Sequence, residues 1–322
     1  MSQTECSTMA PSSTTMTLET QPMTQTIETL QNTNSHFTLT DPSIQHLKAI
    51  AEKGRMDALE MIYTAQSGHP GTSFSCMDIL TALWMGHMRH NPAQEQHPDR
   101  DRFVMSKGHG APALYAILMA AGYIPESEKS TLRQVNSNLQ GHPASKYVKG
   151  VDVSTGSLGQ GLSCAVGMAL GHRLNNSPAR VYALLGDGEC QEGNIWEAAM
   201  SATHHKVNRL TAIVDRNQLQ IDGDTEKVKA LGDIRAKFDA FGWKTYVVDG
   251  HNYNDILNTL AQCDADAETG TTPTLIVANC IKGKGVSFME NQAGWHGKAP
   301  NDDEYKAALS ELQQTYNALT AQ

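Results

Sequence analysis

The sequence predicts an α/β fold in which a doubly wound parallel sheet carries helices on both faces. Five apolar runs are short enough to be buried strands, and stretches with helical periodicity separate most of them. Strands that are joined through helices need crossover connections, so they form a parallel sheet that is covered on both sides. The predicted strands are residues 103–105, 181–185, 210–214, 245–248 and 274–278.

The first helix is expected to begin beside a proline. Asp41 suits the N-cap and Pro42 the first helical position, where an N–H would have no partner within the helix. Apolar side chains then recur at helical spacing from Leu47 to Tyr63 and mark a face that packs against a core. Further helices are predicted over residues 77–88, 111–121, 162–174, 195–204, 234–241, 255–261 and 303–319, and Gly122 and Gly242 lie where helix C-caps belong.

Composition divides the 322 residues into two parts. Residues 1–40 are rich in Ser, Thr, Gln and Met and contain few aliphatic side chains. Such a segment buries too little apolar area to offset the entropy lost on ordering, so we expect it to be a disordered extension. Residues 41–322 are expected to form the folded domain.

The overall charge and the absence of apolar spans narrow the class of protein. A net charge of −9 disfavours a nucleic acid or an anionic membrane as the partner. No apolar run approaches the roughly 20 residues that cross a bilayer, and the amino terminus does not resemble a secretory signal. Six scattered cysteines without a CxxC pair are expected to be reduced thiols in a cytoplasmic protein.

Metal-binding side chains follow two consecutive predicted strands. Asp187 lies in a Gly-Asp-Gly-Glu segment directly after the strand at 181–185, and Asn217 follows the strand at 210–214. Because ligands collect beyond the carboxyl ends of parallel strands, we expect both side chains at one edge of the sheet. A carboxylate and an amide oxygen suit Mg²⁺, and Gly188 lets the backbone approach a phosphate. A Gly-Asp-Gly segment alone is more often a simple turn.

Four histidines lie among Gly, Ser or Pro residues, and therefore in loops. His69, His109, His142 and His296 occur in the segments SGHPG, SKGHG, GHP and WHG. A loop histidine on a rigid scaffold can bind a diphosphate oxygen or move a proton near neutral pH. Each one taken alone is more often an ordinary surface or capping residue.

A glycine-rich segment, TGSLGQG at residues 155–161, precedes a predicted helix. Glycines after a strand can hold the pyrophosphate of a dinucleotide, but Gly156, Gly159 and Gly161 are spaced as GxxGxG and not as GxGxxG. Further along the chain, Lys282 and Lys284 either face a phosphate or belong to a solvated turn, and the sequence leaves both interpretations open.

Together these segments resemble the transketolase family, whose enzymes depend on thiamine diphosphate. The resemblance extends from about Asp41 to the end of this chain, and it matches the first portion of the family's sequences. It implies the diphosphate domain of the thiamine diphosphate-binding fold. It also implies a metal ion (Mg²⁺, or Ca²⁺ or Mn²⁺) held by Asp187, Asn217 and the carbonyl of Leu219.

The same resemblance assigns roles to the other site residues. His69, His142 and His296 would surround the reactive carbon of the cofactor and the sugar hydroxyls, and His109 and His296 would reach the diphosphate. Gly156, Ser157 and Leu158 would hold the aminopyrimidine ring. Glu192 would lie at the interface between two halves of the active site, although a carboxylate at a helix N-terminus is also favoured by the helix dipole alone. Asp249-Gly250-His251 matches the family as a turn beyond a strand.

In transketolases a second, pyrimidine-binding domain supplies an essential glutamate and the basic residues that grip the sugar phosphate. No such domain is recognisable before Gln322, so the resemblance implies the first subunit of a split transketolase. A partner subunit would carry the second domain, with two copies of each chain as the minimum assembly (a heterotetramer). The implied reaction transfers a two-carbon ketol unit between ketose and aldose phosphates in the pentose phosphate pathway.

Three other functions remain open at this stage. A related thiamine diphosphate enzyme could act on another sugar phosphate, because the residues that contact the sugar lie mostly outside this chain. A cofactor-binding subunit without activity of its own is a second alternative, and the intact set of histidines and metal ligands counts against it. A nicotinamide-dependent dehydrogenase is disfavoured by the glycine spacing.

Overall fold

The computed structural model describes residues 43–321. The predicted disordered extension and the predicted cap at Asp41 and Pro42 lie outside the described residues. The first described helix, α2 (Ile44–Ala65), has Ser43 as its N-cap, and the Ser43 hydroxyl accepts a hydrogen bond from the His46 N–H at 3.2 Å. The helix therefore begins later than predicted, because a serine that can cap it directly follows the proline.

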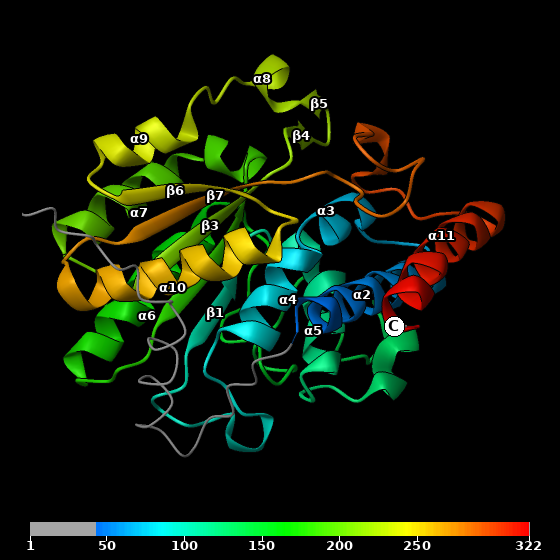
Figure 1. The fold of residues 1–322 in the computed structure, drawn as a ribbon, viewed down its shortest axis with the longest axis horizontal. Coiled ribbons are helices and arrows are strands. Elements are labelled where there is room, and N and C mark those ends of the chain that lie inside the picture. The colour runs from blue at the N-terminus through cyan, green and yellow to red at the C-terminus, as the bar shows by residue number, and fades with distance from the viewer. Residues whose placement is uncertain (1–42, 322) are drawn as a thin grey trace, which may run out of the picture. The chain divides into compact units, whose positions relative to one another are not determined.

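The central sheet has five parallel strands in the order β1-β2-β3-β7-β6 (Figure 1). All five coincide with the predicted apolar runs, which confirms the fold class. The strands are β1 (Arg102–Met105), β2 (Val181–Gly186), β3 (Leu210–Arg216), β6 (Lys244–Asp249) and β7 (Thr274–Asn279).

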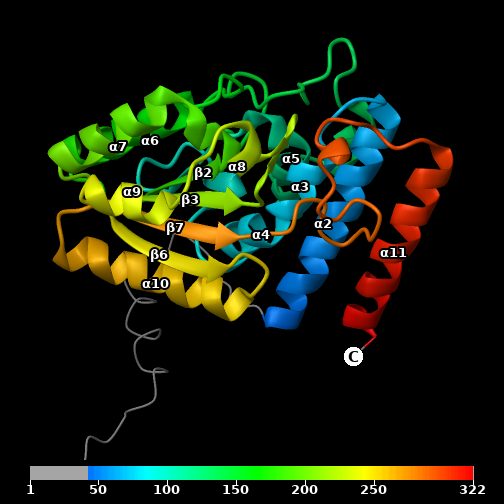
Figure 2. The ribbon, with the colours of Figure 1, turned by 90° about the horizontal axis from the view of Figure 1, so that it is seen from above.

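The helices cover both faces of the sheet. One face carries α6 (Gln160–Leu174), α7 (Gly193–His204) and α9 (Ile234–Ala240), and the other carries α4 (Met77–Gly86) and α10 (Tyr253–Thr269). Figure 2 shows α6 and α7 on one side of the strands and α10 on the other. Right-handed crossovers explain this division, because the chain moves across the sheet in one direction from β1 to β3 and returns from β6 to β7.

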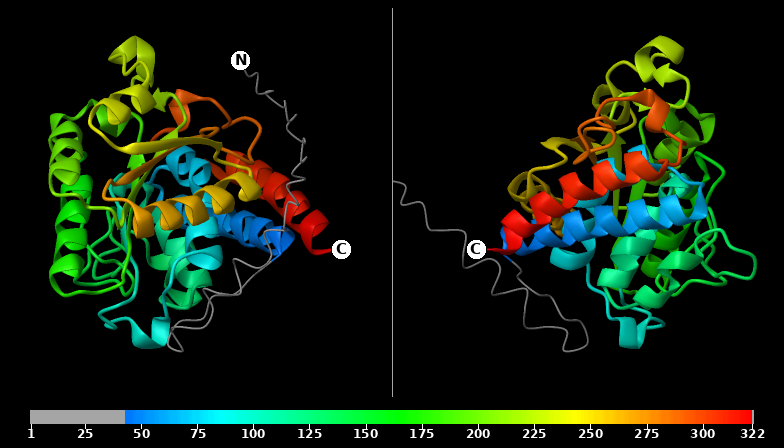
Figure 3. Two further views of the ribbon diagram at one scale, coloured as in Figure 1. Left: turned by 60° about the vertical axis from the view of Figure 1, so that its left-hand side comes forward. Right: turned by 90° about the vertical axis from the view of Figure 1, so that its right-hand side faces the viewer.

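Two long helices lie side by side outside the helices that touch the sheet. Here α11 (Asp302–Thr320) packs along α2, which also packs against α5 (Ala111–Ala120) (Figure 3). The rings of Tyr63 and Tyr305 stack across the two helices, with centroids 4.0 Å apart. Asn301 and Glu304 form a capping box that fixes the start of α11.

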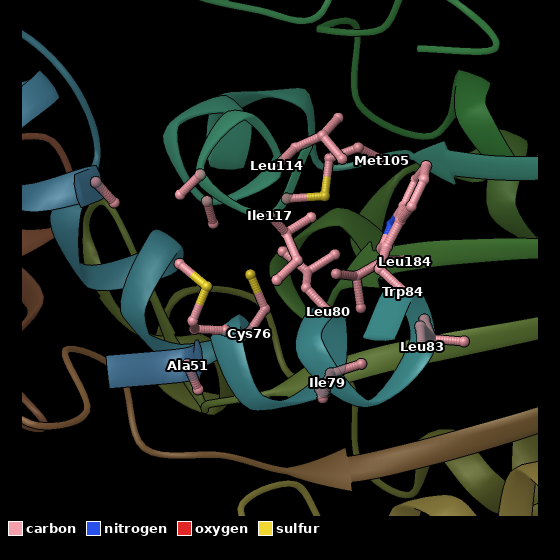
Figure 4. Packing of buried hydrophobic residues seen from close by; sticks show 14 of the residues in the cluster. Ala51, Cys76, Ile79, Leu80, Leu83, Trp84, Met105, Leu114, Ile117 and Leu184 are labelled. Carbon is pink, nitrogen blue, oxygen red and sulfur yellow. The ribbon is translucent and has the colours of Figure 1, made fainter. Parts of the chain in front are cut away.

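Alternate residues of each central strand point to opposite cores. In β3, Ile213 belongs to the cluster on the α4 side and Val214 to the cluster on the α6 side. Figure 4 shows Leu80 and Trp84 of α4, Leu114 and Ile117 of α5, and Leu184 of β2 packed together on the first of these sides. The two cores hold the strands, and therefore the loops at their carboxyl ends, in fixed positions.

Several features differ from the sequence-based expectation or were too short to predict. The strand β6 was expected to be buried, but it is an edge strand, and Val247 is 51% exposed. Gly122 and Gly242, which were predicted at the C-caps, directly follow the C-cap residues Ala121 and Phe241 of α5 and α9 and adopt left-handed φ angles of 80° and 85°. The short elements are α3 (Pro70–Ser75), α8 (Thr225–Val228), β4 (Leu219–Gln220), β5 (Gly223–Asp224) and the 3₁₀ turns η1 (Pro92–Gln94), η2 (Gly108–Gly110), η3 (Glu126–Thr131), η4 (Gly188–Gln191) and η5 (Ala293–Trp295).

The structure also bears on the predictions about membrane spans and about the cysteines. Within residues 43–321, no helix combines the length and the apolar character that a membrane span requires. The five cysteines in this range are free thiols, and Cys76, Cys190 and Cys263 are buried, as the sequence predicts for small apolar core residues.

Replacement of a core leucine tests the packing of the sheet. Leu184 is fully buried, so Leu184→Ala is expected to lower the free energy of unfolding by about 2–5 kcal/mol, measured by urea denaturation. The same change at Leu174, which is 82% exposed, is the matched control and is expected to stay within about 0.5 kcal/mol of wild type. Equal effects at the two positions would contradict this description of the core.

Candidate functional site

The predicted site residues lie in loops at the carboxyl edge of the sheet. The loop after β1 contains η2 and His109, the loop after β2 contains Asp187 and η4, and the loop after β3 contains Asn217 and the β4–β5 hairpin. His69 is the N-cap of α3. The arrows of β3 and β7 point toward α3 and toward the loop that follows β7 (Figure 2). Parallel pairing thus brings distant parts of the chain to one edge.

Three of the four predicted histidines form a cluster. The ring centroids of His69 and His109 are 5.2 Å apart, those of His69 and His296 are 5.6 Å apart, and those of His109 and His296 are 5.2 Å apart. His142 is exposed at the rim and lies against Gly156, where an added Cβ would be 3.1 Å from the His142 ring.

All three clustered histidines are held in the neutral form. Burial, followed by the charge of Arg133, lowers the pKa of His69 to about 4. Burial and Lys107 lower the pKa of His109 to about 2, and burial and Lys282 lower the pKa of His296 to about 3. The Nδ1 atoms of His69 and His296 are buried without a hydrogen-bond partner, so each can still bind a polar ligand.

The structure brings together the two segments that contain the three predicted metal ligands. One Asp187 carboxylate oxygen accepts from the Gly188 N–H at 2.8 Å, and the other accepts from the Gln218 N–H at 2.5 Å. The Asn217 amide oxygen accepts from the Leu219 N–H at 3.2 Å. Asp187 therefore lies directly against the segment that contains Asn217 and Leu219.

The electrostatics of this loop fit a cation. Burial, and then the charge of Asp215, raise the pKa of Asp187 to about 6, so the carboxylate lacks full compensation. Arg216 is the nearest cation, with Nη1 3.6 Å from the carboxylate. In the part of the chain that the structure describes, no group of three or more His, Cys, Asp or Glu side chains could hold a metal ion. A metal here would use one carboxylate, amide and carbonyl oxygens, and oxygens from outside the protein, which is a pattern typical of Mg²⁺.

A buried ion pair lies next to the loop that contains Asn217. The Lys107 ammonium is 2.5 Å from the Asp215 carboxylate, and both side chains are almost fully buried. Asp215 also accepts a hydrogen bond from the Asn217 amide nitrogen at 3.2 Å. This contact fixes the orientation of the amide, because the nitrogen faces Asp215 and the oxygen must face away from it.

The structure also separates the two lysines that the sequence left open. Lys282 is buried, and its ammonium donates to the Leu219 carbonyl at 2.9 Å. Burial lowers the pKa of Lys282 to about 8. Lys284 is partly exposed and lies 3.5 Å from Glu290. Lys282 therefore belongs to the site, and Lys284 belongs to a partly solvated turn.

Glycines permit the loops of the site to touch. An added Cβ at Gly108 would be 2.8 Å from the Gly156 nitrogen, and one at Gly159 would be 2.8 Å from the Glu192 Cβ. Glu192 and Ser157 are exposed at the rim, and Leu158 is half-buried. Since Gly159 caps α6 and the preceding strand β1 ends at Met105, this segment does not follow a strand as a dinucleotide fingerprint would.

Sequence reasoning missed Glu189, which connects three of these loops. Its carboxylate accepts from the Ser106 hydroxyl at 2.5 Å, from the Gly159 N–H at 2.9 Å and from the Gly186 N–H at 2.9 Å. The only signal in the sequence was an acidic residue directly after the Gly-Asp-Gly segment. No local pattern indicates which donors it meets.

Comparisons with known proteins agree with this geometry. Residues 46–318 match the family model described as "Transketolase, thiamine diphosphate binding domain". The chain is 41% identical over 276 residues to an apulose-4-phosphate transketolase subunit from Phocaeicola vulgatus, and the match covers 86% of this chain and 97% of the relative. It is 42% identical over 255 residues to the 6-deoxy-6-sulfo-D-fructose transketolase subunit SqwG of Clostridium sp. (strain MSTE9), covering 79% of this chain and 92% of that relative.

Solved transketolase structures share the fold but are longer than this match. The crystal structure of transketolase from Campylobacter jejuni superposes with a TM-score of 0.79 at 31% identity, covering 86% of this chain and 46% of that one. The human transketolase sequence is 39% identical over 256 residues, which are 40% of its length. The matched part of this chain thus corresponds to less than half of the length of these two proteins.

The lowered pKa of His69 predicts a specific pH dependence. A histidine whose folded pKa lies below its unfolded value of 6.5 stabilises the fold above pH 6.5, and this contribution is lost as the pH falls toward about 4. His69→Asn should therefore show a smaller loss of unfolding free energy between pH 6.5 and 4 than wild type, measured by denaturant titration at each pH. His205→Asn, at an exposed position, is the control. Identical pH profiles for wild type and His69→Asn would contradict the burial of this imidazole.

The connecting role of Glu189 predicts a loss of stability. Glu189→Gln keeps the shape but turns an amide NH₂ toward a donor, so the free energy of unfolding should fall by about 1–3 kcal/mol. Glu197→Gln, at an exposed position on α7, is the matched control and should have little effect. If both variants unfold at the wild-type denaturant concentration, Glu189 does not hold the loops together.

Proposed function

The chain belongs to the transketolase family and contains its thiamine diphosphate-binding domain, and on that premise we propose that it is the first subunit of a two-subunit transketolase. The reaction transfers a two-carbon ketol unit from a ketose phosphate to an aldose phosphate. The observation that carries the proposal is the match over 97% and 92% of two relatives that are themselves named as transketolase subunits. Residues 41–322 form the cofactor-binding domain in this proposal.

The proposed cofactors are thiamine diphosphate and Mg²⁺, with Ca²⁺ or Mn²⁺ as substitutes. Asp187, Asn217 and the Leu219 carbonyl hold the metal ion. The raised pKa of Asp187 supports this assignment, because a bound cation supplies the charge that the buried carboxylate lacks. When bound, the cofactor supplies a carbon centre that stabilises negative charge during transfer of the ketol unit.

The other site residues bind and orient in this proposal. Lys282, His109 and His296 surround the diphosphate position, and Gly188 lets the backbone approach it. The unpartnered Nδ1 atoms of His69 and His296 support contacts with polar ligand atoms. As neutral imidazoles, His69, His142 and His296 can each donate or accept a proton at a sugar hydroxyl. Gly156, Ser157 and Leu158 form the edge that holds the aminopyrimidine ring.

A partner subunit completes the site in this proposal. It contributes a pyrimidine-binding domain and the catalytic glutamate of the family, and two copies of each chain form a heterotetramer. The exposure of Glu192, His142 and Ser157 supports this arrangement, because these rim residues are free to meet a second chain. The match to nearly the full length of two relatives that are named as subunits supports a separate partner chain.

The donor and acceptor sugars define a second candidate function. The two related subunits are named for different ketoses, apulose 4-phosphate and 6-deoxy-6-sulfo-D-fructose. A thiamine diphosphate enzyme acting on such an unusual anionic sugar is therefore the alternative to a transketolase of the pentose phosphate pathway. The free thiols of the described residues support a cytoplasmic location for either enzyme.

Replacement of Asp187 tests the proposed function. With the partner subunit present, wild type should bind thiamine diphosphate in a Mg²⁺-dependent manner and transfer the ketol unit. Asp187→Ala should lose both by about 100-fold or more, because it removes a direct metal ligand. Asp255→Ala, at an exposed site on α10, should behave as wild type. Wild-type protein that neither binds the cofactor nor transfers ketol units from any of these sugars would overturn the proposal.

A further inference from the structure

The turn after β6 has no role in the function proposed above, yet it lies in a buried polar network that ends at the site. We propose that His251, in this turn, is a positioning residue that fixes the segment 281–285 and thereby places the Lys282 ammonium beside the cofactor position. The inference rests on the proposed function for the identity of the ligand. The hydrogen bonds that support it are independent of any ligand.

One side of His251 is anchored to a buried ion pair. Arg55 of α2 donates to the Asp78 carboxylate in the first turn of α4, and both side chains are buried. The Tyr253 hydroxyl donates to the other Asp78 oxygen at 3.0 Å. Although burial raises the pKa of Asp78, Arg55 and His251 bring it well below its usual range, so the carboxylate is charged. His251 Nδ1 lies 2.8 Å from this carboxylate.

The other side of His251 holds the chain beyond β7. Its Nε2 accepts a hydrogen bond from the Ile281 N–H at 2.9 Å. A backbone N–H can only donate, so Nε2 carries no proton, and the proton of the neutral ring lies on Nδ1, which donates to Asp78. The two contacts fix one tautomer and one orientation of the ring. His251 thus ties the start of the segment 281–285 to α4.

Lys282, the residue after Ile281, connects the segment 281–285 to the site. Lys282 donates to the Leu219 carbonyl at 2.9 Å, and Gly283 donates its N–H to the Gly71 carbonyl at 3.0 Å. An added Cβ at Gly71 would be 3.1 Å from the Lys282 side chain, so the segment is packed closely between the His69 loop and Leu219. A shift of Ile281 would therefore move the Lys282 ammonium or break its contact with Leu219.

The position of Lys282 is sensitive because only one carbonyl contact and the more distant charges of Asp215 and Asp187 hold its ammonium. Within residues 43–321, the Lys282 ammonium makes no ion pair with a carboxylate, and the acceptor that it meets is the Leu219 carbonyl. A cation held in this way is available to an anionic ligand, and its effect on binding depends on placement within fractions of an ångström. A residue that only stabilised the fold would not act through Lys282.

A double-mutant cycle separates these two roles. The full chain is prepared with its partner, and thiamine diphosphate affinity is measured in Mg²⁺ by isothermal titration for His251→Phe, Lys282→Met and the double variant. His251→Phe should weaken binding by about 10–100-fold, as is typical for residues that orient a ligand-binding group. In the Lys282→Met background the same change should add less than about twofold, because its effect passes through Lys282.

Two further measurements do not depend on the cofactor. Hydrogen exchange of residues 281–291 should become faster in His251→Phe without thiamine diphosphate, since the Ile281 N–H loses its acceptor. His251→Gln retains an acceptor and a donor, and should recover most of the affinity. His251→Ala, which lacks both the acceptor and the donor, takes the place of His251→Phe in the cycle if His251→Phe does not fold. His205→Phe, at an exposed position, is the matched control.

The outcomes distinguish this inference from the proposed function. Multiplicative losses in the cycle, or wild-type affinity together with unchanged hydrogen exchange in His251→Phe, would overturn the positioning role while the proposed function stands. Wild-type protein that binds no thiamine diphosphate would overturn the proposed function. The exchange data would still decide whether His251 holds the segment 281–285.

Discussion

The buried ion pair between Lys107 and Asp215 is the interaction on which the site depends. It joins the loop after β1 to the end of β3, and Asp215 also accepts hydrogen bonds from Ser75 of α3 and from the Asn217 amide. Loss of one partner from such a pair leaves an uncompensated buried charge, at a typical cost of about 3–5 kcal/mol. The pair therefore locks the loops from β1 and β3 and the helix after His69 into one arrangement.

Around this pair the site combines satisfied and unsatisfied polar groups. Glu189 is paired with three donors and fixes the loops. Asp187 has a raised pKa, and His69 and His296 each retain a buried nitrogen without a partner. Buried polar groups are normally satisfied, so these three groups are the ones that a ligand would complete in the proposed function.

Much of this arrangement was predictable from the sequence. Asp187 and Asn217 could be placed together because each follows an apolar run, and parallel strands bring their carboxyl ends to one edge. The four loop histidines were recognisable from their Gly and Pro neighbours. Other features carry no such signal. Ser43 caps α2, and α3 and the β4–β5 hairpin are too short for a hydrophobic period to be detected.

By itself the sequence determined the order of strands and helices and the chemical types at their ends, because hydrophobic periodicity and loop composition are local properties. Only the tertiary structure decided which of these groups meet. Glu189 contacts Ser106 across 83 residues, and His251 contacts Asp78 across 173. It also decided that Lys282 is buried in the site while Lys284 is partly exposed in a turn. The physical reason is that burial and charge compensation depend on neighbours that are distant along the chain.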